Sequence, residues 1–139
     1  SLARLGVVDL QIFDRDVSKA ESLAAELSHR CNARACPDVN TACLGIAGFV
    51  NATPTGMLPD TGMPVPAGIL HPDRWVADVV YYPLVTPLLA HARVLGAKTV
   101  TGRAMTVHQA ADAFTLFTGA TPSLETMFDA FDAVIAARR

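Results

Sequence analysis

Apolar and polar residues alternate along this chain in blocks that favour strands and helices in turn. Residues 7–14 are apolar on both faces, with Val8, Leu10 and Ile12 on one of them, as a buried strand requires. The same criteria predict further strands at residues 33–35, 48–51, 75–81 and 98–101. Helices are predicted between them, within residues 1–5, 18–27, 41–47, 87–96, 106–118 and 124–135.

Helix boundaries carry their own signals. Ser18 and Glu21 have the spacing of a capping box, Thr86 precedes a proline as an N-cap, and Ser123 is placed to cap the last helix. Gly6 is placed to end the first helix. Apolar residues at helical spacing predict buried stripes on the last two helices, comprising Val107, Ala110, Ala111, Phe114 and Phe117, then Leu124, Met127, Phe128, Phe131, Val134 and Ile135.

Strands that alternate with helices of this length predict an α/β fold, with a doubly wound parallel sheet. Such sheets bind ligands at the carboxyl ends of their strands, where Asp14, Asn51 and Tyr81 are expected to lie. A connection rich in proline and glycine spans residues 54–72, and long loops of this kind are often functional.

Composition narrows the function classes. The 139 residues are 51% hydrophobic and 17% charged, which suits one core and one domain. The net charge of −2 and the scattered cations argue against nucleic-acid binding. No apolar run has the length of a membrane helix and no signal peptide opens the chain, so a cytoplasmic protein is expected.

The three cysteines predict no metal site. Cys31, Cys36 and Cys43 are separated by four and six residues, which is neither zinc-ligand nor redox Cys-x-x-Cys spacing. His108 has no partner at a defined spacing either. Reduced thiols and no bound metal are therefore expected.

Two segments have the form of ligand-binding elements. Asn51-Ala52-Thr53-Pro54-Thr55-Gly56-Met57 ends a strand in a Pro/Gly loop, and Thr101-Gly102-Arg103-Ala104-Met105 turns into a helix whose first turn is expected to hold Gln109. A glycine at 102 would let a planar ring approach the backbone, and an amide at 109 offers a donor and an acceptor to a polyol. A plain turn and a solvated glutamine are the alternatives.

Together and in this order, the two segments resemble the C-terminal, cofactor-binding half of the shikimate/quinate dehydrogenase family. The resemblance implies a Rossmann-like domain that uses NAD or NADP to oxidise a ring hydroxyl of shikimate or quinate. It implies that Asn51, Ala52 and Thr53 line the adenosine and pyrophosphate side of the cofactor, and that Val79 and Gly102 contact the nicotinamide through their backbone. Gln109 would hydrogen-bond the substrate hydroxyls, and Tyr81 would lie beside the substrate ring.

Asp14 bears on the cofactor. An acidic residue about 20 positions after the glycine-rich loop binds the ribose hydroxyls in this fold, although an Asp at a strand end also caps turns. Its charge favours NAD, whereas Arg15 is a residue type that pairs with the 2′-phosphate of NADP. Asp14-Arg15-Asp16 replaces the Asn-Arg-Thr of NADP-using members and so resembles the NAD-preferring branch, with Lys19 as a further cation for the ribose or pyrophosphate.

Two features differ from a complete dehydrogenase of this family. Many members have Asp-Gly-x-Gly-Met where this chain has residues 101–105, which leaves the choice between shikimate and quinate open. The family's catalytic Lys and Asp come from an N-terminal substrate domain, and no such pair is recognisable here. Residues 1–139 are thus expected to be a partial dinucleotide-binding domain without its glycine-rich loop and catalytic residues, in a possible homodimer. The alternative is a non-catalytic nucleotide-binding or regulatory module.

Overall fold

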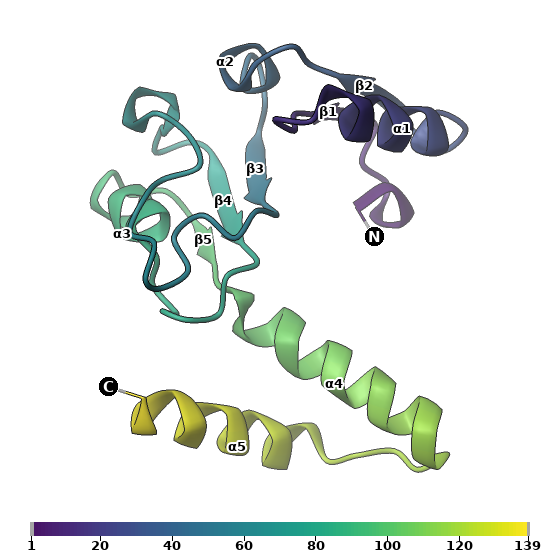
Figure 1. Ribbon diagram of the computed structural model, residues 1–139, viewed down its shortest axis with the longest axis vertical. Coiled ribbons are helices and arrows are strands. Elements are labelled where there is room, and N and C mark those ends of the chain that lie inside the picture. The colour runs from purple at the N-terminus through teal and green to yellow at the C-terminus, as the bar shows by residue number, and fades with distance from the viewer. Residues whose placement is uncertain (1, 139) are drawn as a thin grey trace. The chain divides into compact units, whose positions relative to one another are not determined.

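The computed structural model describes residues 2–138, which form two compact units that divide between Ile46 and Ala47 (Figure 1). Every strand pairing among the described residues is parallel. The α/β fold with parallel pairing, predicted from the alternating pattern, is confirmed. Among these residues no helix is long and apolar enough to cross a membrane.

The first unit is a two-stranded parallel sheet with a helical crossover. Its elements are the 3-10 helix η1 (Leu2–Leu5), β1 (Asp9–Ile12), α1 (Val17–Leu27), β2 (Asn32–Ala35) and α2 (Val39–Ala42). β1 and β2 pair from Asp9 with Asn32 to Ile12 with Ala35. Helix α1 buries its small residues Ala20 and Ala24, which lets it lie close to the sheet.

The second unit contains a three-stranded parallel sheet in the order β3-β4-β5. Its elements are β3 (Gly48–Asn51), the 3-10 helix η2 (Ala67–Ile69), β4 (Trp75–Asp78), α3 (Pro87–Val94), β5 (Thr99–Val100), α4 (Gly102–Thr118) and α5 (Leu124–Ala137). Val76, Leu88 and Leu89 are buried almost completely and form the centre of its core. Helix α3 begins where expected, because the Thr86 hydroxyl accepts a hydrogen bond from Leu89 N and proline occupies the first turn.

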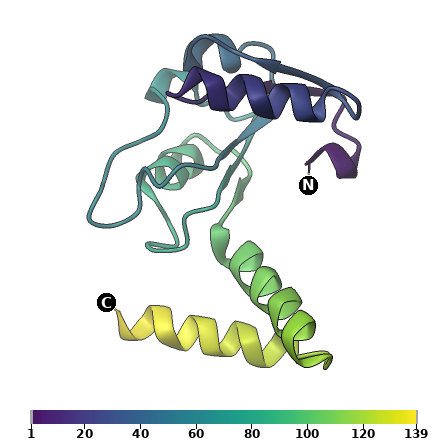
Figure 2. The same cartoon turned by 45° about the vertical axis from the view of Figure 1, so that its right-hand side comes forward.

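Helices α4 and α5 form a hairpin, in which α4 runs away from β5 and α5 runs back, as two views show (Figures 1 and 2). Gly119, with a φ of 72°, ends α4 in the left-handed conformation that glycine adopts without strain. Ser123 caps α5 as predicted, its hydroxyl accepting from Thr126 N.

Several boundaries differ from the prediction. The strand expected at residues 7–14 is only Asp9–Ile12 and pairs with β2, whereas β3 and β4 share the other sheet. The strand expected at 75–81 ends at Asp78, because that side chain turns inward to accept hydrogen bonds. The N-cap of helix α1 is Asp16 and not Ser18, so the prediction of a capping box at Ser18 and Glu21 is wrong.

The predicted stripe on α4 is half right. Val107 and Ala111 are buried, but Phe114 is 44% and Phe117 84% exposed, and Ala110 is exposed too. Beyond its first turns α4 packs mainly against α5, so one neighbouring helix covers only part of its surface. On α5, Ile135 is buried, whereas Leu124 and Val134 are exposed.

Candidate functional site

A buried polar network lies where β3 and β4 end. Asn51, Asp78 and Thr86 are 3%, 2% and 0% exposed, respectively. The Asp78 carboxylate accepts hydrogen bonds from Asn51 Nδ2 at 3.0 Å, Val80 N at 3.0 Å and Thr86 Oγ1 at 2.7 Å. A buried carboxylate needs such donors to offset its desolvation. The network therefore fixes the chain just after β4 and the start of α3.

Asn51 extends this network into the loop after β3. Its Oδ1 accepts from Thr53 N at 3.0 Å and from Thr53 Oγ1 at 2.7 Å, and its Nδ2 also donates to Thr55 O at 3.2 Å. All polar atoms of the Asn51 side chain are thus engaged inside the protein. Asn51 is suited to hold Ala52 and Thr53 in position, while those two residues face the surface.

The first turn of α4 lies against the chain that follows β4. A Cβ added at Gly102 would stand 2.6 Å from Val80 O and closer still to Val79 O. The space beside Gly102 is thus filled by backbone, and the need for glycine arises from this close approach rather than from a ligand ring. Gly102 therefore fixes where α4 begins relative to β4.

A cavity of about 380 Å³ lies beside these elements. Residues of the loop after β3, the chain after β4 and the first half of α4 line it: Ala52, Thr53, Pro54, Met57, Val79, Val80, Tyr81, Met105, Thr106 and Gln109. Five of the residues predicted from the sequence are thereby brought together, namely Ala52, Thr53, Val79, Tyr81 and Gln109. The lining is mainly apolar with a few polar groups, which is typical of small-molecule sites.

Gln109 reaches this cavity from a different position than expected. Because α4 begins at Gly102, Gln109 lies seven residues, or about two turns, into the helix and not in its first turn. Its side chain is exposed, so its amide is available to a ligand. Tyr81, 40% exposed, is held by an edge contact with the Phe131 ring, with centroids 6.4 Å apart.

A second cavity, about 460 Å³, is lined by Leu58, Tyr82, Pro83, Leu84, Val85, Ile135 and Arg138. Its one cationic side chain, Arg138, lies over the Tyr82 ring, 5.5 Å from the centroid. The Tyr82 hydroxyl donates to Arg138 O at 2.8 Å. The smaller cavity is the better candidate, because it lies at the carboxyl ends of parallel strands.

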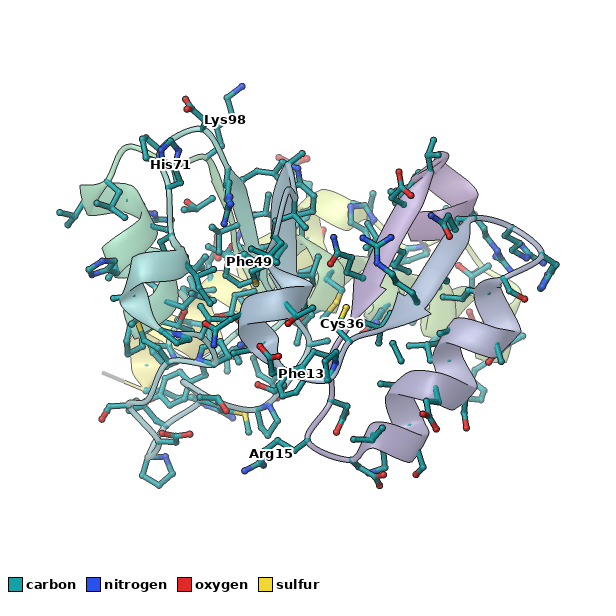
Figure 3. The ribbon with its side chains drawn as sticks, turned by 90° about the horizontal axis from the view of Figure 1, so that it is seen from above. Phe13, Arg15, Cys36, Phe49, His71 and Lys98 are labelled. Carbon is teal, nitrogen blue, oxygen red and sulfur yellow. The ribbon has the colours of Figure 1, made fainter. Side chains whose placement is uncertain are left out.

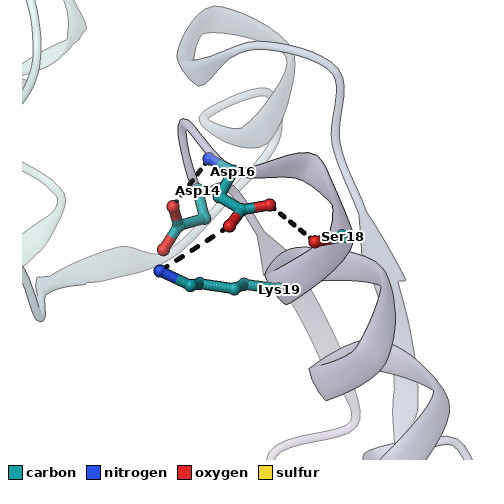
Figure 4. A network of polar contacts seen from close by, with 4 residues as sticks. All are labelled: Asp14, Asp16, Ser18 and Lys19. Carbon is teal, nitrogen blue, oxygen red and sulfur yellow. Dashed lines mark hydrogen bonds and ion pairs between the residues drawn. The ribbon is translucent and has the colours of Figure 1, made fainter.

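The turn after β1 and the start of α1 carry Asp14, Asp16 and Lys19 (Figure 4). Asp14 Oδ1 accepts from Asp16 N at 2.8 Å, so Asp14 does cap the turn that follows it. Asp16 accepts from Ser18 Oγ at 2.6 Å and pairs with Lys19 Nζ at 3.7 Å. The Ser18 hydroxyl, with a smaller contribution from Lys19, holds the pKa of the Asp16 carboxyl below its usual value.

The capping role of Asp14 leaves a ligand role open. Its Oδ2 makes no hydrogen bond among residues 2–138, and the side chain is exposed. Arg15 is exposed as well and extends outward from the turn (Figure 3). Lys19, with a side chain 72% exposed, faces Asp16.

Two polar residues of the network were not predicted as site residues. Asp78 lies inside the segment 75–81 that was predicted to be a strand, and Thr86 was predicted only as a helix cap. One signal in the sequence could have indicated the network, namely a single carboxylate at the end of an apolar segment. A carboxylate in such a place is expected to be buried, and a buried charge requires partners nearby. Within the described part of the chain, no group of three or more His, Cys, Asp or Glu side chains could hold a metal ion.

Parallel strands with helical crossovers and a cavity at their carboxyl ends define a Rossmann-like α/β domain. Residues 102–130 match the family model described as the Shikimate 5'-dehydrogenase C-terminal domain. The chain is 44% identical over 135 residues to a quinate/shikimate dehydrogenase (NAD(+)) of Corynebacterium efficiens, covering 91% of this chain and 46% of that protein. It is 46% identical over 127 residues to a shikimate dehydrogenase (NADP(+)) of Streptomyces avermitilis, covering 88% and 44%.

Solved structures agree with the sequence relatives. Quinate dehydrogenase from Corynebacterium glutamicum in complex with NAD has a TM-score of 0.86 and 38% identity, covering 95% of this chain and 49% of that one. The resemblance found in the sequence is confirmed, and the chain belongs to the shikimate/quinate dehydrogenase family. It spans about half the length of the curated relatives it matches.

Proposed function

We propose that the protein containing this chain is an NAD-dependent quinate/shikimate dehydrogenase. It would transfer hydride between the ring carbon that bears the reacting hydroxyl and the nicotinamide, giving the 3-dehydro acid. The observation that carries the proposal is the 44% identity to a relative named for this activity with NAD(+), together with the fold shared with an NAD complex. The cavity at the strand ends supports it, because its lining combines apolar walls with few polar groups.

The residues of this chain fit a dinucleotide. The exposed Oδ2 of Asp14 suits the hydroxyls of the adenosine ribose, with Arg15 and Lys19 as nearby cations. Ala52 and Thr53 would face the adenosine and pyrophosphate side, and Val79 would contact the nicotinamide. When bound, the nicotinamide ring supplies the hydride acceptor.

Gly102 and Asn51 would act through position. Gly102 brings the backbone of α4 against Val79 and Val80. Its own backbone would then contact the nicotinamide end of the cofactor. Asn51 would hold Thr53 from inside the protein through two hydrogen bonds. Both roles keep cavity-lining backbone in a fixed geometry before the ligand arrives.

Gln109 and Tyr81 would orient the acid. The exposed Gln109 amide can both donate to and accept from ring hydroxyls, and the Tyr81 ring would lie beside the substrate ring. None of the ten cavity-lining residues carries a carboxylate, an imidazole or an amine. The base that takes the hydroxyl proton would therefore come from outside this lining, as the Lys and Asp of the family's substrate domain imply. This chain would contribute binding and orientation.

The preference for NAD rests on the charge of Asp14. Its carboxylate would repel a 2′-phosphate while accepting hydrogen bonds from a free diol. Arg15 opposes this preference, and relatives of both cofactor types exist. Asp14 is fixed by the hydrogen bond that it accepts from Asp16 N, whereas the exposed Arg15 has no hydrogen bond or ion pair within the described chain, so the carboxylate would be the better-ordered group.

Steady-state assays of the full-length protein, crossing shikimate and quinate with NAD and NADP, test the proposal. We expect turnover with at least one of the two acids and a higher kcat/KM with NAD than with NADP. Nucleotide binding without turnover of either acid would contradict the enzyme and favour a non-catalytic nucleotide-binding module. Turnover with NADP alone would contradict the role given to Asp14.

A further inference from the structure

An ion pair joins the first turn of α4 to α5. Arg103 Nε donates to Asp132 Oδ1 at 2.7 Å and Arg103 Nη2 donates to Asp132 Oδ2, so the guanidinium binds both carboxylate oxygens in a bidentate pair. The guanidinium carbon also lies 4.3 Å from the centroid of the Phe128 ring, within cation–π range. The two side chains are only partly exposed, at 34% and 48%. A two-point contact of this kind fixes orientation as well as distance.

This geometry shifts the pKa values of both groups. Arg103 lowers the pKa of the Asp132 carboxyl below its usual value, first by hydrogen bonding and then by its charge. Asp132 in turn raises the pKa of Arg103, with a smaller contribution from Asp129. The pair stays charged across the neutral range.

The pair is adjacent to the parts of α4 that shape the cavity. Arg103 follows Gly102, whose backbone lies against Val79 and Val80, and it precedes Met105 and Gln109 on the same helix. Helix α5 also contacts a residue that lines the cavity, because the Phe131 ring lies against the Tyr81 ring. One helix, α5, thereby supports both Tyr81 and the start of α4.

We propose that Arg103 and Asp132 are a positioning pair that holds α4 so that Gln109 keeps its place in the cavity. This inference rests on the proposed dehydrogenase function. Neither side chain is among the cavity-lining residues, so the pair acts through the helix and not on the substrate. Small displacements of an orienting group are enough to lower a rate, since a shift of about 1 Å can cost on the order of 100-fold.

A purely structural ion pair predicts something different. Partly exposed ion pairs contribute little to folding stability and their loss leaves the site intact. A positioning pair instead affects use of the acid far more than it affects stability. Its loss should also leave nucleotide affinity nearly unchanged, because the ribose contact proposed for Asp14 lies on another element. Comparing the change in kcat/KM for the acid with the changes in thermal stability and NAD affinity therefore separates the two possibilities.

The test uses the full-length protein with Asp132→Asn, Arg103→Gln, the double variant and Asp132→Glu. Asp112→Asn is the matched control, because Asp112 is an exposed carboxylate on α4 that makes no hydrogen bond or ion pair within the described chain. Asp132→Asn is expected to lower kcat/KM for the acid about 10-fold, with the Kd for NAD within about 2-fold of wild type. Asp132→Glu should recover most of the loss, and the double variant should be no worse than either single one.

The possible outcomes show separately whether the positioning role fails and whether the proposed dehydrogenase function fails. If wild type turns over and Asp132→Asn behaves as Asp112→Asn does, the positioning role is refuted while the dehydrogenase stands. Equal loss of acid use, NAD affinity and thermal stability would also refute it, since that pattern indicates general destabilisation of the protein and not a displacement of Gln109. A wild-type protein without turnover refutes the proposed function and the positioning role with it.

Discussion

Replacing Gly102 by alanine tests the link between helix position and the cavity. The added methyl group would stand 2.6 Å from Val80 O and closer to Val79 O, whereas a carbon and a carbonyl oxygen ordinarily stay about 3.3–3.6 Å apart. The first turn of α4 must therefore move by roughly 0.7 Å or more to relieve the overlap. Neither partner is a side-chain end that could rotate away, because both are backbone atoms of the segment that lines the cavity.

The magnitude follows from two opposing effects. Overpacking of this kind costs about 1–3 kcal/mol, and alanine recovers about 0.5–1 kcal/mol of helix propensity. A net loss of about 1–2 kcal/mol lowers the Tm of a protein of this size range by roughly 2–8 °C. Because Gln109 moves with the helix, kcat/KM for the acid should fall about 10-fold or more.

Differential scanning fluorimetry and steady-state kinetics of the full-length protein measure both effects. Gly68→Ala is the matched control, because a Cβ there meets nothing within 4 Å and its φ lies outside the left-handed region. We expect Gly68→Ala to match wild type in both measurements. If Gly102→Ala matches it too, the close approach of α4 to the chain after β4 does not constrain the site, and the argument for Gly102 is refuted.

The remaining predictions concern other residues. Asp14→Ala should weaken NAD binding by about 1–3 kcal/mol while leaving NADP unchanged or improved, as fluorescence titration of both would show, and equal weakening would make Asp14 a turn cap alone. Gln109→Ala should lower kcat/KM for the acid by the equivalent of about 1.5–3 kcal/mol with little change in NAD affinity, and a parallel loss of both would contradict its substrate role. Thr86→Val, which leaves Asp78 Oδ2 without its hydroxyl donor, should destabilise the protein by about 2–3 kcal/mol in thermal unfolding, whereas Thr86→Ser should not. Arg103 lowers the pKa of Asp132, so the contribution of this ion pair to kcat/KM should be present at neutral pH and should be lost as the pH falls through the lowered pKa. If Asp132→Asn leaves kcat/KM at neutral pH unchanged, this contribution is contradicted.

The sequence was most informative where one local rule decides the structure. β3 begins and ends as predicted at Gly48 and Asn51, and Thr86 and Ser123 cap their helices, because strand hydrophobicity and N-cap chemistry act over a few residues. The start of α4 was placed four residues too late. Gly102 has the local properties of a turn residue, and only the approach of the backbone that follows β4 explains why it begins a helix.

The candidate site shows the same division. Ala52, Thr53, Val79, Tyr81 and Gln109 were predicted from the resemblance to the family, and the structure places all five around one cavity. The bond from Asn51 to Asp78 joins residues 27 positions apart, and periodicity within either segment carries no information about such a contact. The Arg103 and Asp132 pair is likewise separated by 29 positions and depends on the angle of the helix hairpin.

Stability and function are coupled in this site through Asp78. One of its oxygens accepts from Asn51 and Val80, which adjoin the cavity, and the other accepts from Thr86, which starts a core helix. Because the carboxylate is 2% exposed, removing any donor leaves charge without compensation in the interior. The same three bonds that make the buried charge tolerable therefore also set the backbone positions of the cavity wall. Substitutions at Asp78 should consequently lower stability and ligand affinity together, whereas substitutions at Gln109, which is exposed, should affect ligand use alone.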